Sequence, residues 1–202
     1  MINTLFLDLG GVLLTNGWDS EARNKAAKAF DLDVVELTER HNMIFYIYEQ
    51  GNLTLDEYLD KVIFYKERHF KHDDFRSFMV AQSQPHSKMM KLFSQLKAKY
   101  GLKLVALSNE GRELAEYRIK TYGLNEIIDF FVVSSFVHLR KPDFDFYRMA
   151  LDITQVPLQH IIYIDDRQML VEVAGSLGIA GIHHTSYEST REKLASMGLT
   201  LA

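Results

Sequence analysis

Five short apolar runs, each followed by polar residues, set the strongest limit on how this chain can fold. The runs are only four to six residues long and rich in β-branched side chains, which favours buried strands over helix fragments. Most stretches between the later runs carry apolar residues at helical spacing, and two of these stretches stop at Gly101 and Gly123. The predicted strands are residues 4–7, 102–107, 130–133, 161–164 and 179–182.

Strands and helices therefore alternate through the C-terminal part of the chain. This order predicts an α/β fold, a doubly wound parallel sheet covered by helices on both faces. The predicted helices of this part are residues 88–100, 114–122, 144–153 and 170–177.

Residues 16–84 interrupt the alternation. The capping-box pattern of Thr54 and Glu57 precedes apolar residues that share one face of a helix, and the whole stretch is rich in aromatic side chains. We therefore predict a helical cap domain at residues 16–84, inserted after the first strand of an α/β core domain made of residues 1–15 and 85–202.

Polar residues at the ends of the predicted strands are the candidates for function. Ligands of an open parallel sheet bind beyond the carboxyl ends of its strands, where several loops meet. The fourth strand ends in two adjacent acids, and a lysine lies in the turn after the third. The candidates are Asp8, Ser108, Asn109, Lys141, Asp165 and Asp166.

These residue types suit phosphoryl transfer assisted by a metal. The chain has no cysteine, so any catalytic metal must be held by oxygen or imidazole ligands. Asp8 together with one or both of Asp165 and Asp166 offers the carboxylates that Mg²⁺ prefers. Lys141 supplies a compact positive charge that reduces the repulsion between an attacking carboxylate and a phosphate dianion.

Four motifs in this order resemble the haloacid dehalogenase (HAD) superfamily, in particular its phosphatases with a helical C1 cap, the subfamily IA type. They are Leu5–Leu13 (LFLDLGGVL), Leu107–Asn109 (LSN), Arg140–Asp143 (RKPD) and Ile164–Asp166 (IDD). Each motif alone is weak, but four in order, each beside a predicted strand end, are specific together. The resemblance covers nearly the whole chain and implies a Rossmann-like core.

The resemblance also implies roles for the site residues. Asp8 would be the nucleophile that forms an aspartyl-phosphate, and Lys141 would stabilise it. The metal, Mg²⁺, would be held by Asp8, the carbonyl of Gly10, and Asp165 or Asp166. The substrate, a small phosphorylated metabolite, would contact Ser108, Asn109, Gly10, Gly11, Trp18 and Glu49.

Gly10 departs from the family pattern, because these phosphatases carry there a second aspartate that acts as general acid. Such acid–base catalysis contributes about 10²- to 10⁴-fold. A branch with glycine at this position looks similar and includes sugar-phosphate phosphatases, which favours retained activity. Because the acid is missing, we expect substrates with a stabilised leaving oxygen, such as an anomeric sugar phosphate or an acyl phosphate. Glu49 is a candidate replacement acid. The alternatives are a non-catalytic protein that binds a phosphometabolite and a 2-haloacid dehalogenase, although the paired acids Asp165 and Asp166 argue against the dehalogenase.

Other charged residues have simpler interpretations. Asp8 alone could cap a turn, and Asp165 and Asp166 could cap the next helix. Arg140 and Arg167 are expected to be structural or surface ion-pair residues. His183 and His184 are adjacent on a strand and point to opposite faces, so we do not expect them to share a metal.

Charge and hydropathy limit the partners. The formal net charge of −4 offers no attraction for nucleic acid. No apolar run approaches the roughly 18 residues that span a bilayer, and Asp8 interrupts the apolar N-terminus before a signal peptide could form. We expect a cytoplasmic protein without a membrane partner, and its oligomeric state is left open.

Overall fold

The structure, a computed structural model, describes residues 1–201 and contains one sheet of five parallel strands. Their order is β3-β2-β1-β4-β5, so the first strand lies in the middle and the chain crosses to its other side only after β3. The strands are β1 (Thr4–Leu7), β2 (Lys103–Ser108), β3 (Phe130–Val133), β4 (Ile161–Asp165) and β5 (Ala180–His183). The predicted α/β parallel sheet is confirmed.

Side chains of the central strands alternate between two hydrophobic cores. Leu5 and Leu7 of β1 pack with the helices on one face, whereas Phe6 between them belongs to the core on the other face. The first face is covered by α5 (Ser87–Tyr100) and α10 (Tyr187–Ser196), and the second by α8 (Phe144–Thr154) and α9 (Gln168–Ser176). Because both faces are buried, the strands are apolar at nearly every position.

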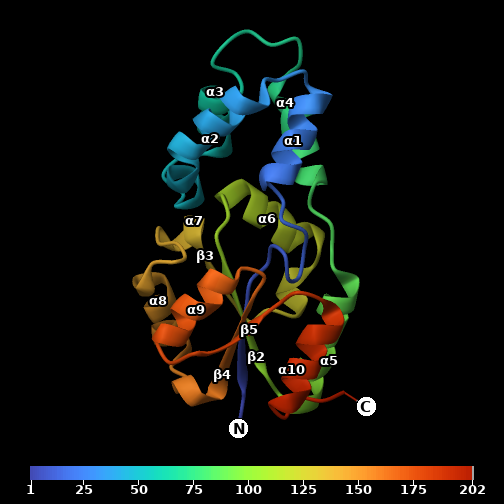
Figure 1. Ribbon diagram of the computed structural model, residues 1–202, viewed down its shortest axis with the longest axis vertical. Coiled ribbons are helices and arrows are strands. Elements are labelled where there is room, and N and C mark those ends of the chain that lie inside the picture. Colours follow the sequence, from blue (N-terminus) through green and yellow to red (C-terminus); the bar gives the residue numbers. More distant parts are fainter. Residues whose placement is uncertain (202) are drawn as a thin grey trace.

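Four helices between β1 and α5 form a separate layer beyond the carboxyl edge of the sheet (Figure 1). They have their own core of aromatic and aliphatic side chains, in which Tyr58 and Phe75 are fully buried. Thr54 and Glu57 make the expected capping box at the start of α3. The helices are α1 (Ser20–Ala29), α2 (Val34–Glu49), α3 (Leu55–Val62) and α4 (His72–Ala81). We call them the helical unit.

Two linkers join the helical unit to the sheet. They run side by side, since the Thr15 amide donates to the carbonyl of Gln84 over 2.8 Å and Leu14 bridges Pro85. The linkers coincide with the domain boundaries that the sequence predicts at residues 15/16 and 84/85, which stay a prediction. Three further helices lie in the sheet part: α6 (Arg112–Thr121) and the 3₁₀ turns η1 (Leu124–Glu126) and η2 (Leu158–His160).

The short helix α7 (Ser134–Val137) follows β3 directly, and neither it nor α10 is anticipated by the apolar pattern. Helix α10 has only two buried side chains, Thr190 and Leu194, so its sequence lacks an apolar stripe. Among residues 1–201, no helix combines the length and apolar character needed to cross a membrane.

Candidate active site

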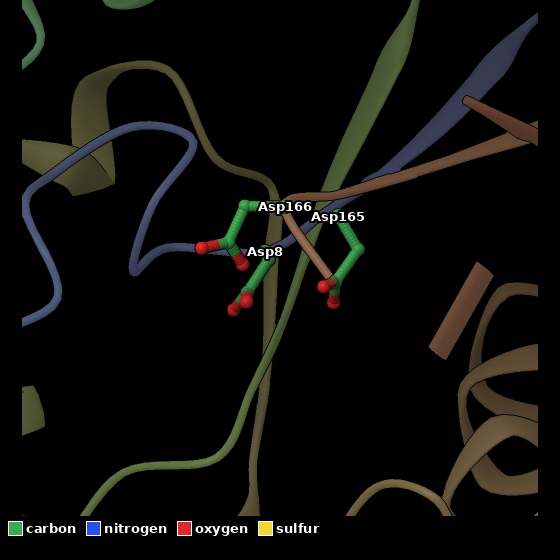
Figure 2. A group of neighbouring side chains, drawn as sticks. All are labelled: Asp8, Asp165 and Asp166. Carbon is green, nitrogen blue, oxygen red and sulfur yellow. The ribbon is translucent and has the colours of Figure 1, made fainter. Parts of the chain in front are cut away.

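Three carboxylates meet at the carboxyl edge of the sheet. Asp8 follows β1, Asp165 is the last residue of the neighbouring β4, and Asp166 comes next. One carboxylate oxygen from each lies within 4.8 Å of the others. Figure 2 shows the three side chains grouped together. Strands β2 and β3 lie on one side of β1, and β4 and β5 lie on the other, so the order of strands reverses beside β1. Doubly wound sheets bind ligands at such a position.

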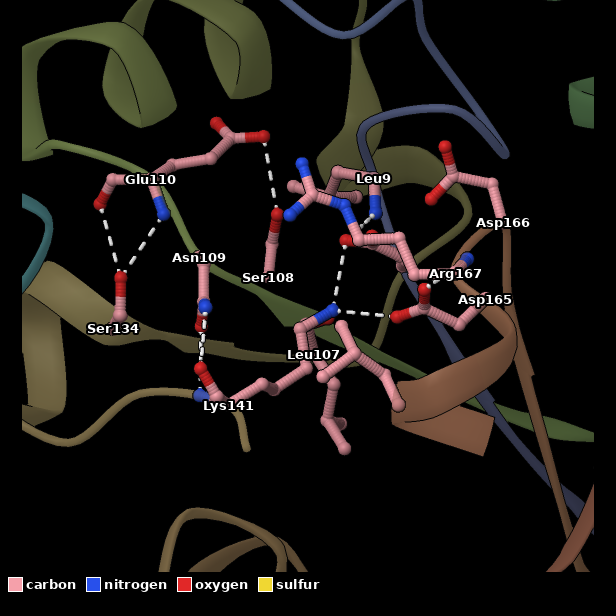
Figure 3. A network of polar contacts seen from close by, with 12 residues as sticks. Leu9, Leu107, Ser108, Asn109, Glu110, Ser134, Lys141, Asp165, Asp166 and Arg167 are labelled. Atoms are coloured by element: carbon pink, nitrogen blue, oxygen red, sulfur yellow. Dashed lines mark hydrogen bonds and ion pairs between the residues drawn. The ribbon is translucent and has the colours of Figure 1, made fainter. Parts of the chain in front are cut away.

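The Lys141 ammonium lies between two of these carboxylates. Its Nζ is 3.2 Å from Oδ1 of Asp8 and 2.8 Å from Oδ2 of Asp165, and it also donates to the carbonyl of Leu107 over 2.8 Å (Figure 3). The Lys141 residue is only 2% exposed, so the ion pairs are largely shielded from water.

Burial and charge together determine the protonation of this cluster. Burial lowers the pKa of Lys141, but the charges of Asp8 and Asp165 outweigh it, and the pKa ends above its usual value. Burial acts to raise the pKa of Asp165, yet the charge and hydrogen bond of Lys141 hold it below the usual range. Burial raises the pKa of Asp8 to about 7 against the opposing charge of Lys141. Asp8 is thus the carboxylate that titrates near neutral pH.

The donor set fits a hard divalent cation. Both oxygens of Asp165 already accept hydrogen bonds, from Lys141, the Tyr163 hydroxyl and the backbone of Arg167. Asp166 is different: its Oδ1 is buried and has no hydrogen-bond partner among residues 1–201. Three carboxylates against one ammonium leave an excess of negative charge, and oxygen ligands of this kind suit Mg²⁺.

Ser108 is the last residue of β2, Asn109 follows it, and both lie in the segment beside the cluster. The Asn109 amide donates to the Lys141 carbonyl and accepts from the Lys141 amide, both over 2.8 Å, so this side chain positions the lysine. The Ser108 hydroxyl donates to Oε1 of Glu110 over 3.1 Å (Figure 3). The Asn109 side chain is therefore occupied by the lysine turn.

A buried ion pair links that loop to both linkers. The guanidinium of Arg118 on α6 contacts Oε1 of Glu110 over 2.5 Å, and it also donates to the Ser83 hydroxyl over 2.9 Å and the Thr15 carbonyl over 3.0 Å. Arg118 and Glu110 are 1% and 5% exposed. One side chain thus connects the loop after β2 to both segments that lead into the helical unit.

A cavity of about 360 Å³ extends from the carboxylates to the helical unit. The sheet part contributes Asp8, Ser108 and Lys141 to its walls, and the helical unit contributes Trp18, Tyr48 and Glu49. The site therefore has room for a small organic molecule next to Asp8.

Comparison with known proteins identifies the family. A family model described as a haloacid dehalogenase-like hydrolase matches residues 2–178. The chain belongs to this family. A HAD-like family hydrolase from Porphyromonas gingivalis has a TM-score of 0.80 at 17% identity, with all of both chains covered. A HAD family enzyme from Bacteroides thetaiotaomicron, solved with magnesium and inorganic phosphate, has a TM-score of 0.74 at 21% identity, with 92% of this chain and 95% of that chain covered.

A fungal protein is also similar. A drimenol cyclase from Aspergillus calidoustus is 25% identical over 201 residues, which are 98% of this chain but 37% of the fungal protein. The chain thus spans just over a third of the length of this curated relative.

Gly10 of this HAD-like hydrolase faces Asn16. A Cβ added at Gly10 would lie 2.8 Å from Oδ1 of Asn16, and Nδ2 of Asn16 donates to Oδ2 of Asp166 over 3.1 Å. An amide, which cannot donate a proton as an acid does, therefore occupies the space next to the position of the expected aspartate.

The predicted site residues divide into two groups. Asp8, Gly10, Trp18, Glu49, Ser108, Asn109 and Lys141 all line the same cavity. Gly11, Asp165 and Asp166 are not among the residues that line it. The backbone of Gly11 packs against Asp166, and a Cβ at Gly11 would lie 2.1 Å from Oδ2 of that residue.

Two expectations about arginines fare differently. Arg140 is an ion-pair residue as expected, since its Nη2 lies 2.7 Å from Oε2 of Glu49. Arg167 is exposed as expected, but among residues 1–201 it pairs with no carboxylate, and it lines the cavity. His183 and His184 bond to different partners, the carbonyl of Asp166 and the hydroxyl of Thr190.

Sequence reasoning missed Asn16, Arg23, Glu110 and Arg118, all of which line the cavity. Asn16 lies in an irregular loop, and the two arginines occupy helix positions that are ordinarily solvent-exposed. The closeness of Glu110 to Ser108 was the one available signal, because an acid directly after the strand-end motif lies at the same edge of the sheet.

Proposed function

We propose that this protein is a Mg²⁺-dependent phosphatase that hydrolyses a small phosphorylated metabolite through an aspartyl-phosphate on Asp8. One observation carries the proposal: the carboxylates of Asp8, Asp165 and Asp166 lie together, the buried Lys141 pairs with the first two, and Asp8 and Lys141 line a cavity. The magnesium and inorganic phosphate bound by the Bacteroides thetaiotaomicron enzyme support it.

The chain's own residues account for the first half-reaction. The unprotonated carboxylate of Asp8 attacks phosphorus, a new O–P bond forms, and the bond from phosphorus to the leaving oxygen breaks with its electron pair. Lys141 neutralises negative charge on the nucleophile and on the phosphoryl oxygens. Mg²⁺, held by Asp8, Asp166 and the other oxygen ligands, would supply further charge neutralisation. Water then hydrolyses the acyl phosphate and restores Asp8.

At Gly10 the loop after β1 offers no acid that could protonate the leaving oxygen. Gly10 has no side chain and Asn16 beside it is not an acid. The arrangement favours substrates whose leaving oxygen is stabilised, such as the anomeric oxygen of a sugar 1-phosphate, over alkyl phosphates. A comparison of kcat/KM on a sugar 1-phosphate and its 6-phosphate isomer tests this point, and a clear preference for the 6-phosphate contradicts it.

The test of the proposal is release of p-nitrophenol from p-nitrophenyl phosphate, a substrate whose leaving group needs no acid. We expect turnover with Mg²⁺, loss of turnover with EDTA, and a loss of at least about 10³-fold in Asp8→Asn. Asp152→Asn, an exposed aspartate on α8, is the matched control and should retain full activity. Turnover of this substrate that persists in EDTA would contradict the Mg²⁺ dependence.

A second candidate function is binding of a phosphometabolite without turnover, and the absence of an acid at Gly10 favours it. Wild-type protein that binds inorganic phosphate in the presence of Mg²⁺ but releases no p-nitrophenol would establish this alternative.

A further inference from the structure

Besides the buried pair of Arg118 and Glu110, three arginines line the cavity together with Glu49. Arg23 of α1, Arg140 and Arg167 line the same cavity as Glu49, the last residue of α2. Only Arg140 has a carboxylate partner, with its Nη2 2.7 Å from Oε2 of Glu49. Among residues 1–201, no carboxylate oxygen lies within 4.0 Å of Arg23 or Arg167. This part of the cavity has more positive than negative charge.

The remaining acid on this side does not remove the excess. Asp19 also lines the cavity, but its side chain accepts the amide of Ala22 over 2.8 Å as the N-cap of α1. Its carboxylate forms no ion pair with any of the three arginines within the same 4.0 Å limit. Burial raises the pKa of Glu49 while the charges of Arg140 and Arg167 oppose that rise, so both guanidinium groups act on this one carboxylate.

Two of the guanidinium groups also have a buried N–H donor without an acceptor in the part of the chain that the structure describes. Nε of Arg23 and Nε of Arg140 are buried and have no hydrogen-bond partner among residues 1–201. Arg23 is half-buried, and of its donors only Nη1 is bonded, to the carbonyl of Trp18 over 2.8 Å. Buried N–H groups of a cation without an acceptor are costly, and an anionic ligand that accepts from them would remove that cost.

The walls beside these arginines are aromatic. Cζ of Arg140 lies 5.1 Å from the ring centre of Phe45, and Tyr48 and Trp18 line the same part of the cavity. Aromatic walls exclude water and strengthen ion pairs made between them. The three arginines and Glu49 line the same cavity as Asp8 and Lys141, and none of the three arginines pairs with Asp8.

We infer that the substrate carries a second anionic group, a carboxylate or a phosphate, and that Arg23, Arg140 and Arg167 bind it at a subsite separate from the phosphoryl group that Asp8 attacks. The inference rests on the proposed function for the identity of the first group. It assigns the arginines a role in specificity. Phosphorylated sugars or amines without a second anionic group are then poor ligands.

Binding to the Asp8→Asn protein with Mg²⁺ tests the subsite without turnover. Calorimetry compares two matched pairs: 3-phosphoglycerate with glycerol 3-phosphate, and fructose 1,6-bisphosphate with fructose 6-phosphate. In at least one pair, the ligand with the extra anion should bind about 10- to 100-fold more tightly, the range of a charge-assisted hydrogen bond. The first pair reports on a carboxylate and the second on a phosphate. Equal affinities in both pairs overturn the inference.

Variants identify the residues responsible. In the Asp8→Asn background, Arg23→Gln and Arg167→Gln should each reduce the affinity ratio of the preferred pair about tenfold or more. Arg23→Lys, which keeps the charge, should recover part of the ratio, a result that a merely structural arginine would not produce. Arg148→Gln on the surface of α8 is the control and should leave the ratio unchanged. A ratio that survives in both Gln variants contradicts the assignment.

Failure of the subsite and failure of the phosphatase proposal give different results. Wild-type protein that hydrolyses p-nitrophenyl phosphate but shows no preference in either pair retains the phosphatase proposal and excludes the subsite. A preference that depends on Arg23 in a protein without turnover supports the subsite and favours the binding-protein alternative.

Discussion

Lys141 is the side chain on which the charge balance of the site depends. It is buried between Asp8 and Asp165, and the residue is only 2% exposed. Replacing it with a neutral residue would leave two carboxylates close together without compensation, which costs about 3–5 kcal/mol for a buried pair. The same charge lowers the barrier to attack on phosphate, so the residue serves stability and chemistry together.

Magnesium activation should depend on pH through Asp8. Burial raises the pKa of Asp8 in the metal-free protein to about 7, and Mg²⁺ must displace the proton to bind. The Mg²⁺ concentration for half-maximal activity should therefore rise below pH 7, by up to about tenfold per pH unit, and stay constant above it. Titrations of Mg²⁺ at pH values from 5.5 to 8.5 measure this. A flat profile would mean that Asp8 is already ionised across the range.

Restoring the family's second aspartate requires two changes. In Gly10→Asp alone the new side chain would displace Asn16 and release its hydrogen bond to Asp166, so we expect little gain. Gly10→Asp with Asn16→Ser removes the contact and should raise kcat on a sugar 6-phosphate by about 10²-fold. On p-nitrophenyl phosphate the gain should be small, since that leaving group needs no proton. Equal gains on both substrates would argue against a proton-transfer role.

The turn after α2 docks the helical unit onto α7. The carbonyl of Glu49 accepts from the Ser134 hydroxyl over 2.5 Å, and Nδ1 of His138 lies 2.7 Å from the carbonyl of Gln50. Gly51 comes next with φ +72°, and a Cβ there would lie 2.4 Å from the backbone carbonyl of Ser135. Only glycine allows the two backbones to approach this closely.

Gly51→Ala should therefore destabilise more than an ordinary change at positive φ. Gly101→Ala is the matched control, because Gly101 has φ +65° with open space around its Cβ position. We expect a cost of about 1 kcal/mol for Gly101→Ala, from backbone strain alone, and about 3 kcal/mol for Gly51→Ala. Urea unfolding measures both. Similar costs for the two variants would show that the contact with α7 contributes nothing.

The ion pair of Arg118 on α6 with Glu110 in the loop after β2 is a second connection between the sheet part and the linkers. Arg118→Met alone would leave Glu110 charged and buried, at a cost of about 3–5 kcal/mol. Adding Glu110→Leu should recover most of the stability, because no buried charge remains. Urea unfolding of the single and double variants gives the coupling energy. Additive costs in the double variant would show that the two charges do not depend on each other.

At the scale of the whole molecule, the cavity beside Asp8 is lined by residues of both the sheet part and the helical unit. Any ligand that bridges these parts should stabilise the folded chain by mass action. The three grouped carboxylates, with only the Lys141 ammonium to balance them, make Mg²⁺ the first ligand to test.

Mg²⁺ should raise the Tm of the protein. At a concentration of about 100 times Kd the stabilisation is about 2.7 kcal/mol, which corresponds to a rise of about 5–10 °C for a chain of this size. Asp166→Asn should reduce the rise, since it removes a charge from the carboxylate whose Oδ1 has no partner. Thermal unfolding with Mg²⁺ and with EDTA measures the difference. A Tm unaffected by Mg²⁺ would remove the metal from the proposal.

The local pattern of residues was sufficient to predict the strands, most of the helices and the candidate residues at the strand ends. Parallel strands bring their carboxyl ends to the same edge of the sheet, so the sequence alone predicts that Asp8, Ser108 and Asp165 lie near one another. Helix α10 escaped prediction because its few buried residues make no apolar stripe. The domain boundaries at residues 16 and 84 remain predictions that the linkers agree with.

Residues that are close in the sequence determine the hydrophobic periodicity, the helix caps and the turns. These local patterns were enough to predict the parallel sheet and to place Asp8, Lys141 and the acidic pair Asp165 and Asp166 near its strand ends. Packing between distant segments specifies the rest. The burial of Arg118 with Glu110, Asn16 beside Gly10, and Arg23 and Arg167 facing Glu49 all join residues that are far apart in the chain or lie in irregular loops. Such contacts depend on how helices and loops meet in space, which no short-range pattern records.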